Sequence, residues 1–345
     1  MRLTLLVPEL IWPEPGDQLT LGKLTAPGFA WLAAHAAFTK RPRRPFETAL
    51  ANLFGLSDAP FGALRRLGET IAATPDDGHW LCADPVHLRF HHERIILADA
   101  GAFELSEPEA QAIVESLNAE FADVGTFYTA TARRWYLRLN AAVDHDSKPI
   151  SAIAGRRIDG ELPANNSPLT RWLNEVQMFL HGHPVNERRQ AAGHPAVNSL
   201  WLWGGGALPG SSNPPFATVW SDNPLATGLA RSQGIPAHGL PDGLSKILAE
   251  TRQTDEALIV LDSLLPPVLY ENGEDWRTAW QALDRDWFAP LRSALGRQVD
   301  TLTIVAPTIY GQLNWSLLGK DRWKFWRKPQ TLADIARELS EGSPS

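Results

Sequence analysis

The chain has 345 residues, of which 44% are hydrophobic, so it can bury the core of one large or two ordinary domains. Its formal net charge of −7 argues against broad electrostatic binding to nucleic acid or anionic lipid, and neither is expected as a partner. A single cysteine, Cys82, excludes an internal disulfide framework and a multi-cysteine zinc site, and it fits a reducing compartment.

The N-terminal segment predicts the first strand of an α/β core. Residues 2–7 form a continuous apolar run, which is typical of a central parallel strand, and the run ends at Pro8-Glu9. Prolines and glutamates interrupt it before a signal peptide is complete, and no run in the chain approaches the roughly 20 apolar residues that cross a bilayer. We therefore expect a soluble, cytoplasmic protein.

Helical patterns follow this strand. Residues 27–38, 48–56 and 62–72 are each compatible with a helix. Residues 41–45 form a basic, proline-broken stretch, which we interpret as a solvated connection rather than a nucleic-acid arm, because isolated positive runs are usually solvated.

The composition then changes toward β-structure. Residues 80–97 predict two strands and residues 127–139 predict further strand, while residues 107–121 between them predict a helix capped by Ser106. A run of two strands, a helix and more strand is typical of a small α+β insert.

In the C-terminal half, short apolar runs at residues 217–220, 258–261 and 299–305 alternate with helical stretches. This alternation predicts an α/β fold with a mostly parallel sheet flanked by helices. The predicted domains are a discontinuous α/β core of residues 1–75 and 167–330, an inserted α+β domain of residues 76–166, and a C-terminal helix or tail of residues 331–345.

The densest group of signals lies between residues 183 and 206. It reads His183-Pro184-Val185-Asn186, then Gly193 and Asn198-Ser199, then Trp201-Leu202-Trp203-Gly204. This segment resembles the corresponding part of archaeal-type, cofactor-independent phosphoglycerate mutases, which belong to the alkaline phosphatase superfamily. Further matches follow in the same order along the chain: Val7-Pro8, Ala51-Asn52-Leu53, Asp84 through Arg89, and Leu117-Asn118. The resemblance implies an alkaline-phosphatase-like fold.

A second resemblance concerns three other segments. Trp80 through Arg89, Arg134 through Leu139 and Trp323 through Arg327 together look like a bacterial group labelled RpfE-type regulatory proteins. The name of that group suggests regulation but supplies no mechanism.

The mutase resemblance implies two divalent metals, a serine that carries phosphate, and clustered Asp and His ligands, because paired metals stabilise the attacking and leaving oxygens of a phosphoryl transfer. The sequence departs from this pattern near its start. Glu9 stands where the resemblance implies a metal-binding aspartate, Thr48 where it implies the nucleophile, and Ala49 where it implies a ligand. The nearby pair Ser57-Asp58 is an alternative, although such pairs commonly begin turns.

The C-terminal half departs further, because no histidine occurs after His238. Thr308 and Ile309 fall where the resemblance implies Asp and His, and Asp262 is the best remaining strand-end carboxylate. Two histidine pairs, His91-His92 and His181 with His183, come without an acidic cluster and are interpreted as structural or solvated. One carboxylate and a distant glutamate do not make a two-metal site. We therefore predict no cofactor, and Mn or Mg only if the protein is an active enzyme.

Five residues form a candidate ligand site: Arg89, His183, Asn186, Arg188 and Arg189. Arginine holds carboxylates and phosphates through paired donors, and the resemblance places these positions near a substrate cleft, so a phosphorylated or carboxylated small molecule is the expected ligand. In the alternative, Asn186 caps a helix and the arginines bridge acidic neighbours or lie in solvent.

Aromatic and cationic residues alternate in Trp323-Lys324-Phe325-Trp326-Arg327-Lys328. Trp323, Phe325 and Trp326 are candidate contacts for a protein partner. We prefer the simpler interpretation, in which the rings pack against the body of the protein and the cations stay in solvent.

These observations leave three hypotheses. In the first, the chain is a mutase-like protein without metal catalysis that has a regulatory or ligand-sensing role. In the second, it is an active phosphomutase or phosphatase with Thr48 as nucleophile and Glu9 and Asp262 as ligands. In the third, it is a non-catalytic interaction scaffold.

Overall fold

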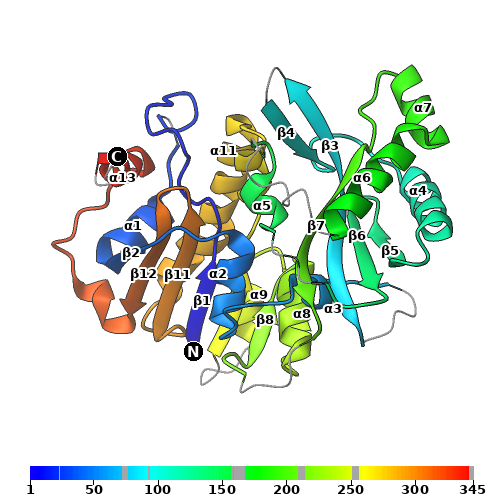
Figure 1. The fold of residues 1–345 in the computed structure, drawn as a ribbon. Helices are drawn as coiled ribbons and strands as arrows, with labels where there is room; N and C mark the ends of the chain where they lie inside the picture. Colours follow the sequence, from blue (N-terminus) through cyan, green and yellow to red (C-terminus); the bar gives the residue numbers. More distant parts are fainter. Residues whose placement is uncertain are drawn as a thin grey trace. The chain divides into compact units, whose positions relative to one another are not determined.

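The computed structural model describes residues 1–22, 24–71, 77–91, 94–143, 145, 147–156, 158, 168–208, 214–250 and 256–341. The chain forms two compact units, the first made of Met1–Gly55 with Asn213–Ser345 and the second of Leu56–Ser212 (Figure 1). None of the described helices is both long enough and apolar enough to cross a membrane.

The first unit contains a seven-stranded sheet in the order β2-β12-β11-β1-β10-β8-β9. The strands are β1 (Arg2–Leu6), β2 (Ala37–Arg41), β8 (Thr218–Trp220), β9 (Ala237–His238), β10 (Glu256–Val260), β11 (Thr301–Thr308) and β12 (Gly311–Leu318). The predicted central strand is confirmed, since β1 pairs in parallel with β10 on one side and β11 on the other. Strands β10, β8 and β9 continue the parallel part, whereas β12 and β2 are antiparallel.

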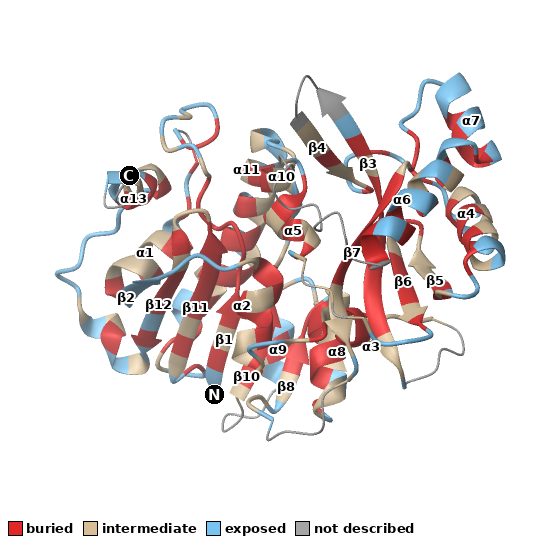
Figure 2. Ribbon diagram, in the orientation of Figure 1, coloured by how far each residue is buried: buried red, intermediate tan, exposed pale blue. Residues whose placement is uncertain are grey.

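The helices of the first unit are α1 (Pro27–His35), α2 (Phe46–Leu53), α8 (Pro224–Ser232), α9 (Leu244–Glu250), α10 (Leu265–Leu269), α11 (Gly273–Leu283), η1 (Asp284–Phe288), α12 (Ala289–Ala294), η2 (Gly319–Trp323) and α13 (Leu332–Glu341). The N-terminus of helix α1 is capped by a carboxylate that is distant in the sequence. The backbone N–H groups of Gly28 and Phe29 donate to Asp284 at 3.1 and 2.8 Å. Only glycine fits at position 28, where a Cβ would lie 2.5 Å from the backbone nitrogen of Ala289. Figure 2 shows the central strands as mostly buried.

The second unit contains a five-stranded sheet in the order β4-β3-β6-β5, with β7 pairing with β3. Its elements are α3 (Phe61–Gly68), β3 (His79–His91), β4 (Arg94–Asp99), α4 (Glu107–Glu120), β5 (Gly125–Thr131), β6 (Arg134–Leu139), α5 (Ile150–Ile153), α6 (Pro168–His181), α7 (Pro184–Ala191) and β7 (Ser199–Gly206). The predicted cap of α4 is confirmed: Ser106 Oγ accepts the N–H of Glu109, and Glu109 accepts the N–H of Ser106. The predicted fold class, a mixed α/β protein with a mostly parallel sheet, is also confirmed.

Two predicted elements differ from the structure. Residues 37–41 are not the end of a helix and the start of a loop, but form the edge strand β2, whose hydrogen bonds come from β12, a strand that the sequence did not predict. Strand β7 pairs antiparallel with β3 in the second unit, although its position in the chain falls within the predicted core of residues 167–330. The long strand β3, of 13 residues, supplies the backbone partners for β7. The observed boundaries between the units therefore lie at about residues 55 and 213 rather than at 75 and 167.

Candidate functional site

Polar residues collect at one edge of the parallel sheet in the first unit. Glu9 follows β1, Asn223 follows β8, Asp262 follows β10, and Thr308 ends β11. Because these strands run parallel, their carboxyl ends meet at the same edge, which is where ligands bind in open α/β sheets. This edge is therefore the candidate position for a ligand or metal site in the first unit.

Asp262 is held by the cap of a neighbouring helix. The Nδ2 group of Asn223 donates to Asp262 Oδ2 at 2.8 Å, while Asn223 Oδ1 accepts the N–H of Leu225 at the start of α8. Burial raises the pKa of Asp262, and the negative charge of Asp222 adds to this effect. The carboxylate is therefore less acidic than an ordinary aspartate, and one of its oxygens accepts a hydrogen bond from a structural amide.

Glu9 and Thr308 occupy two turns at the same edge. Glu9 has a left-handed backbone with φ of 53°, and its carbonyl oxygen accepts the indole N–H of Trp276 at 3.0 Å. Thr308 Oγ1 donates to the carbonyl of Gly311 at 3.0 Å and accepts the N–H of Tyr310 at 3.1 Å. The hydroxyl of Thr308 thus closes the turn between β11 and β12.

Thr48 lies half-buried on α2, and Ala49 beside it is buried in the core. Helix α2 contacts α8, the helix that Asn223 caps, so the candidate nucleophile belongs to the same unit as the strand-end residues. The alternative pair, Ser57 and Asp58, is exposed and joined by a hydrogen bond of 3.1 Å from Ser57 Oγ to Asp58 Oδ2.

In the second unit, Asn186 holds two stretches of backbone together. Its side chain is fully buried, with 0% exposure. Its Nδ2 group donates to the carbonyls of Leu180 at 2.7 Å and Val197 at 2.8 Å, and its Oδ1 accepts the N–H of Val197 at 2.9 Å. Asn186 therefore stabilises the connection between α6, α7 and β7 rather than capping a helix.

The guanidinium of Arg189 is also hydrogen-bonded to other groups of the protein. Its Nε donates to Pro195 O at 2.8 Å, one terminal nitrogen donates to both carboxylate oxygens of Glu109 at 2.9 Å, and the other donates to Glu104 O at 2.6 Å. Arg189 therefore bridges an acidic neighbour, Glu109, as the alternative interpretation of the sequence expected.

His183 caps α7, because its Nδ1 accepts the N–H of Val185 at 3.2 Å, and its Nε2 lies 3.0 Å from Ser116 Oγ. Burial lowers the pKa of His183, and the positive charge of Arg188 lowers it further. A neutral ring with its proton on Nε2 fits both contacts.

Arg89 on β3 and Arg188 on α7 have exposed side chains. Of the five candidate ligand residues, these two leave their charged groups accessible, whereas His183, Asn186 and Arg189 use their polar atoms inside the second unit. Binding of a small anion by the full set stays a prediction.

The second unit contains a buried charge network that was not predicted from the sequence. The guanidinium of Arg65 donates to both oxygens of Asp84 at 2.9 and 2.6 Å, and the indole N–H of Trp203 donates to Asp84 Oδ2 at 2.8 Å. Burial opposes the charge on Arg65, but the Asp84 carboxylate beside it keeps its pKa well above the usual value. Next to this pair, Tyr136 Oη donates to Glu69 Oε1 at 2.9 Å. The sequence signal that could have predicted this network is Asp84, an acidic residue among the apolar residues of β3.

No family model matches the chain. The chain is 28% identical over 208 residues to a 2,3-bisphosphoglycerate-independent phosphoglycerate mutase of Methanosarcina barkeri, covering 56% of this chain and 51% of that protein. It is 28% identical over 137 residues to the enzyme of the same description from Methanosarcina mazei, covering 37% of this chain and 34% of that protein.

The chain is similar to cofactor-independent phosphoglycerate mutases. The matched region spans about half the length of the first of these curated relatives and about a third of the second.

Among solved structures, the PH0037 protein from Pyrococcus horikoshii has a TM-score of 0.55 at 14% identity, with 99% of this chain and 98% of that chain covered. A cofactor-independent phosphoglycerate mutase from Thermoplasma acidophilum has a TM-score of 0.42 at 18% identity, with 99% of each chain covered. The first of these supports the fold.

The described residues of the chain do not fit a two-metal site. Among them, no group of three or more His, Cys, Asp or Glu side chains could hold a metal ion. Mg²⁺ and Mn²⁺ prefer several oxygen ligands in a regular arrangement. The sheet edge offers Glu9, whose side chain is buried, Asp262, which is bound to an amide, and Thr308, which is bound within a turn. His181 is exposed at the end of α6, and His92 lies outside the described residues.

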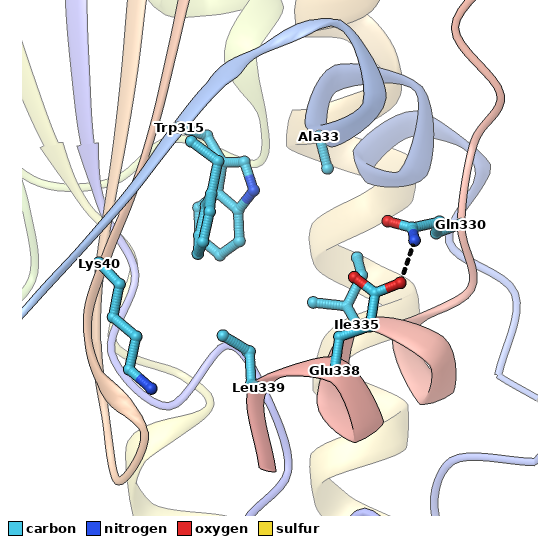
Figure 3. Close-up of a pocket in the computed structure, with 8 residues that line it drawn as sticks. Ala33, Lys40, Trp315, Gln330, Ile335, Glu338 and Leu339 are labelled. Carbon is cyan, nitrogen blue, oxygen red and sulfur yellow. Dashed lines mark hydrogen bonds between the residues drawn. The ribbon is translucent and has the colours of Figure 1, made fainter. Parts of the chain in front are cut away.

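A cavity of about 360 Å³ lies elsewhere in the first unit (Figure 3). Its lining residues are Ala33, Phe38, Lys40, Trp315, Gln330, Ile335, Glu338 and Leu339. Figure 3 shows Lys40 and Glu338 on opposite sides of the space, and Gln330 donates to Glu338 at 2.6 Å. Its size and its mixed apolar and charged lining are typical of small-molecule sites. No local sequence pattern predicts this cavity, because its walls come from separate elements: β2, β12, α1, α13 and the segment before α13.

The aromatic and basic residues near the C-terminus do not behave as we expected. Trp323 is 66% exposed, Phe325 87% and Trp326 65%. The interpretation that these rings pack against the body of the protein is therefore wrong.

Proposed function

We propose that this chain is a phosphoglycerate-mutase-like protein of the RpfE-type regulatory group, that it has no metal-dependent phosphoryl transfer, and that it acts as a regulatory or ligand-sensing protein. The hydrogen bonding of Thr308 carries this proposal. The mutase resemblance implies a metal ligand at this position, but Thr308 has no carboxylate, and its hydroxyl donates its single proton to Gly311 O and accepts the Tyr310 N–H within a turn. Ala49, where the resemblance implies another ligand, offers only a methyl group.

The ligand-sensing part of the proposal is supported by the two exposed guanidinium groups of Arg89 and Arg188. Arginine recognises carboxylate and phosphate through paired N–H donors, so the expected ligand is a phosphorylated or carboxylated small molecule. The charged cavity at Lys40 and Glu338 is a second place where such a molecule could enter.

Metal analysis combined with a phosphoglycerate mutase assay in added Mn²⁺ or Mg²⁺ tests the loss of catalysis. We expect less than one metal ion per chain and no turnover, while the Methanosarcina barkeri enzyme in the same assay is the positive control. Stoichiometric metal together with turnover that Thr48→Ala abolishes would overturn the proposal.

Calorimetric titration with phosphate and with 3-phosphoglycerate tests the ligand. We expect Arg89→Gln and Arg188→Gln each to weaken binding about tenfold, because each removes one charge-assisted contact. Arg43→Gln, which changes an exposed arginine in the first unit, is the matched control and should leave binding unchanged. Leu339→Trp, which fills the cavity, should weaken binding only if the ligand enters there.

A second candidate function, phosphomutase or phosphatase activity with a reduced metal site, is favoured by one observation. Asp262 is a partly exposed carboxylate at the ligand-binding edge of the sheet, and its pKa is raised. In this hypothesis Thr48 is the nucleophile, and Glu9 and Asp262 bind the metal. A screen of phosphoesters with several divalent ions should reveal hydrolysis that both Thr48→Ala and Asp262→Asn remove, and its absence counts against the hypothesis.

A further inference from the structure

The segment of residues 319–328, which we name the aromatic–basic loop, presents an unusual surface. Seven large hydrophobic side chains are exposed among the described residues, and Trp323, Phe325 and Trp326 are three of them, within four positions. Figure 2 shows the connection between β12 and α13, to which these residues belong, as largely exposed. Scattered exposed apolar residues are normal, whereas a group of large rings marks an interaction surface.

Hydrogen bonds and an ion pair fix the backbone of the aromatic–basic loop, and they thereby fix the positions of its exposed rings. Asp321 is buried, and its Oδ2 accepts the N–H of Leu318 at 2.8 Å while its Oδ1 lies 3.0 Å from Lys324 Nζ. Arg322 donates to the carbonyl of Gly296 at 3.2 Å, and its guanidinium lies 4.7 Å from the centre of the Trp323 ring. The rings of Phe325 and Trp326 contact each other edge to face at 5.3 Å.

The charge of the loop is opposite to that of the whole chain. Five cations, Lys320, Arg322, Lys324, Arg327 and Lys328, accompany one carboxylate, Asp321, whereas the chain carries a net charge of −7. Lys320, Arg327 and Lys328 are exposed. An anionic surface would therefore attract this loop and repel much of the remaining protein, which favours a single orientation.

We infer that the aromatic–basic loop binds the surface of an anionic lipid bilayer. Indole and phenyl rings enter the region between headgroups and acyl chains, while lysine and arginine reach the anionic headgroups with their charged ends. The three lysines favour lipid over protein, since lysine is depleted in protein interfaces and contributes at charged membrane surfaces. The overall acidity of the chain predicted no such partner, but the charge is local.

Co-sedimentation of the full chain with vesicles tests this inference. Binding to mixed phosphatidylcholine–phosphatidylserine vesicles should exceed binding to pure phosphatidylcholine and should weaken with added salt. Each surface cation contributes about fivefold to partitioning, so Lys320→Gln/Arg327→Gln/Lys328→Gln should weaken it on the order of 100-fold. The variant Trp323→Ala/Phe325→Ala/Trp326→Ala should also lose binding, even though it keeps every charge.

Two matched controls separate this loop from general effects. Arg41→Gln/Arg43→Gln/Arg44→Gln removes the same number of exposed cations from another segment, and Leu19→Ala/Met178→Ala removes two exposed apolar side chains. Both should keep vesicle binding, and circular dichroism should show that all variants fold. Equal binding to neutral and anionic vesicles, equal losses in the controls, or preference for polyglutamate or single-stranded DNA over vesicles would overturn the inference. The mutase and metal assays have no bearing on this result.

Discussion

The buried charge network of the second unit and the polar sheet edge of the first unit use charged residues in opposite ways. In the network, the guanidinium of Arg65 and the carboxylate of Asp84 satisfy each other through two hydrogen bonds, and both side chains are less than 10% exposed. At the sheet edge, Asp262 faces an amide and a second carboxylate, and its pKa is raised.

The difference shows how a polar residue in an apolar sequence should be interpreted. A buried charge needs a paired partner, so Asp84 within β3 indicates a structural ion pair. A partly exposed carboxylate at a strand end needs no partner, so Asp262 is compatible with a site but does not establish one. Partner geometry distinguishes the two cases, and position in the fold does not.

The largest effect is expected from Asp84→Ala. Loss of the carboxylate leaves the Arg65 guanidinium buried without its ion pair, which should lower the free energy of unfolding by about 3–5 kcal/mol. Urea denaturation measures this change. Asp77→Ala, which removes an exposed carboxylate beside Arg138, should have little effect.

The double variant Arg65→Met/Asp84→Leu sharpens this test. Replacing both charges by apolar side chains should recover most of the lost stability, because burying the pair costs desolvation of both groups. A double variant as unstable as Asp84→Ala would mean that the network contributes more than the pairing of two charges.

Asn186→Ala should have the next largest effect. It leaves the Leu180 carbonyl and both backbone polar groups of Val197 without their side-chain partner, which should cost about 2–4 kcal/mol. Arg188→Gln is the contrasting variant, because its exposed side chain should change anion affinity and leave stability unchanged. If Asn186→Ala weakened anion binding without loss of stability, Asn186 would be a ligand residue rather than a structural one.

Thr308→Val tests the turn at the sheet edge. The valine keeps the shape but removes the hydroxyl that bonds Gly311 O and the Tyr310 N–H, so we expect a loss of about 1 kcal/mol in the free energy of unfolding. Thermal unfolding measures it. Unchanged stability would remove the main support for the proposed loss of metal chemistry.

Local patterns in the sequence predicted the elements whose signals are local. The apolar run of β1 and the Ser106 cap of α4 lie within a few residues of chain, and both were predicted. The exposed edge strand β2 was missed, because its hydrogen bonds come from β12, more than 250 residues away. The placement of β7 beside β3 also depends on long-range pairing, between residues more than 100 positions apart.

The candidate site was harder to predict for the same physical reason. Asn186 and Arg189 have residue types that suit ligand binding, and their sequence neighbours do not show that Val197, Pro195 and Glu109 already satisfy them. Exposure of the rings at Trp323 and Trp326 was also a property of packing rather than of pattern. Residue type predicts what chemistry a side chain can perform, while its contacts decide whether that chemistry is available.

The smallest effect concerns the pH dependence of Asp262. Burial raises its pKa in the folded protein above the ordinary value of 3.8, so the folded state binds this proton more tightly than the unfolded state does. The associated stability is present below about pH 3.8 and is lost as the pH rises through the folded-state pKa. Asp262→Asn has no such proton, so the difference in unfolding free energy between the two proteins should shift in favour of Asp262→Asn as the pH rises from acid toward neutral. A difference that does not change with pH would mean that Asp262 is as well solvated as an ordinary carboxylate, and its pKa would then no longer favour a site at the sheet edge.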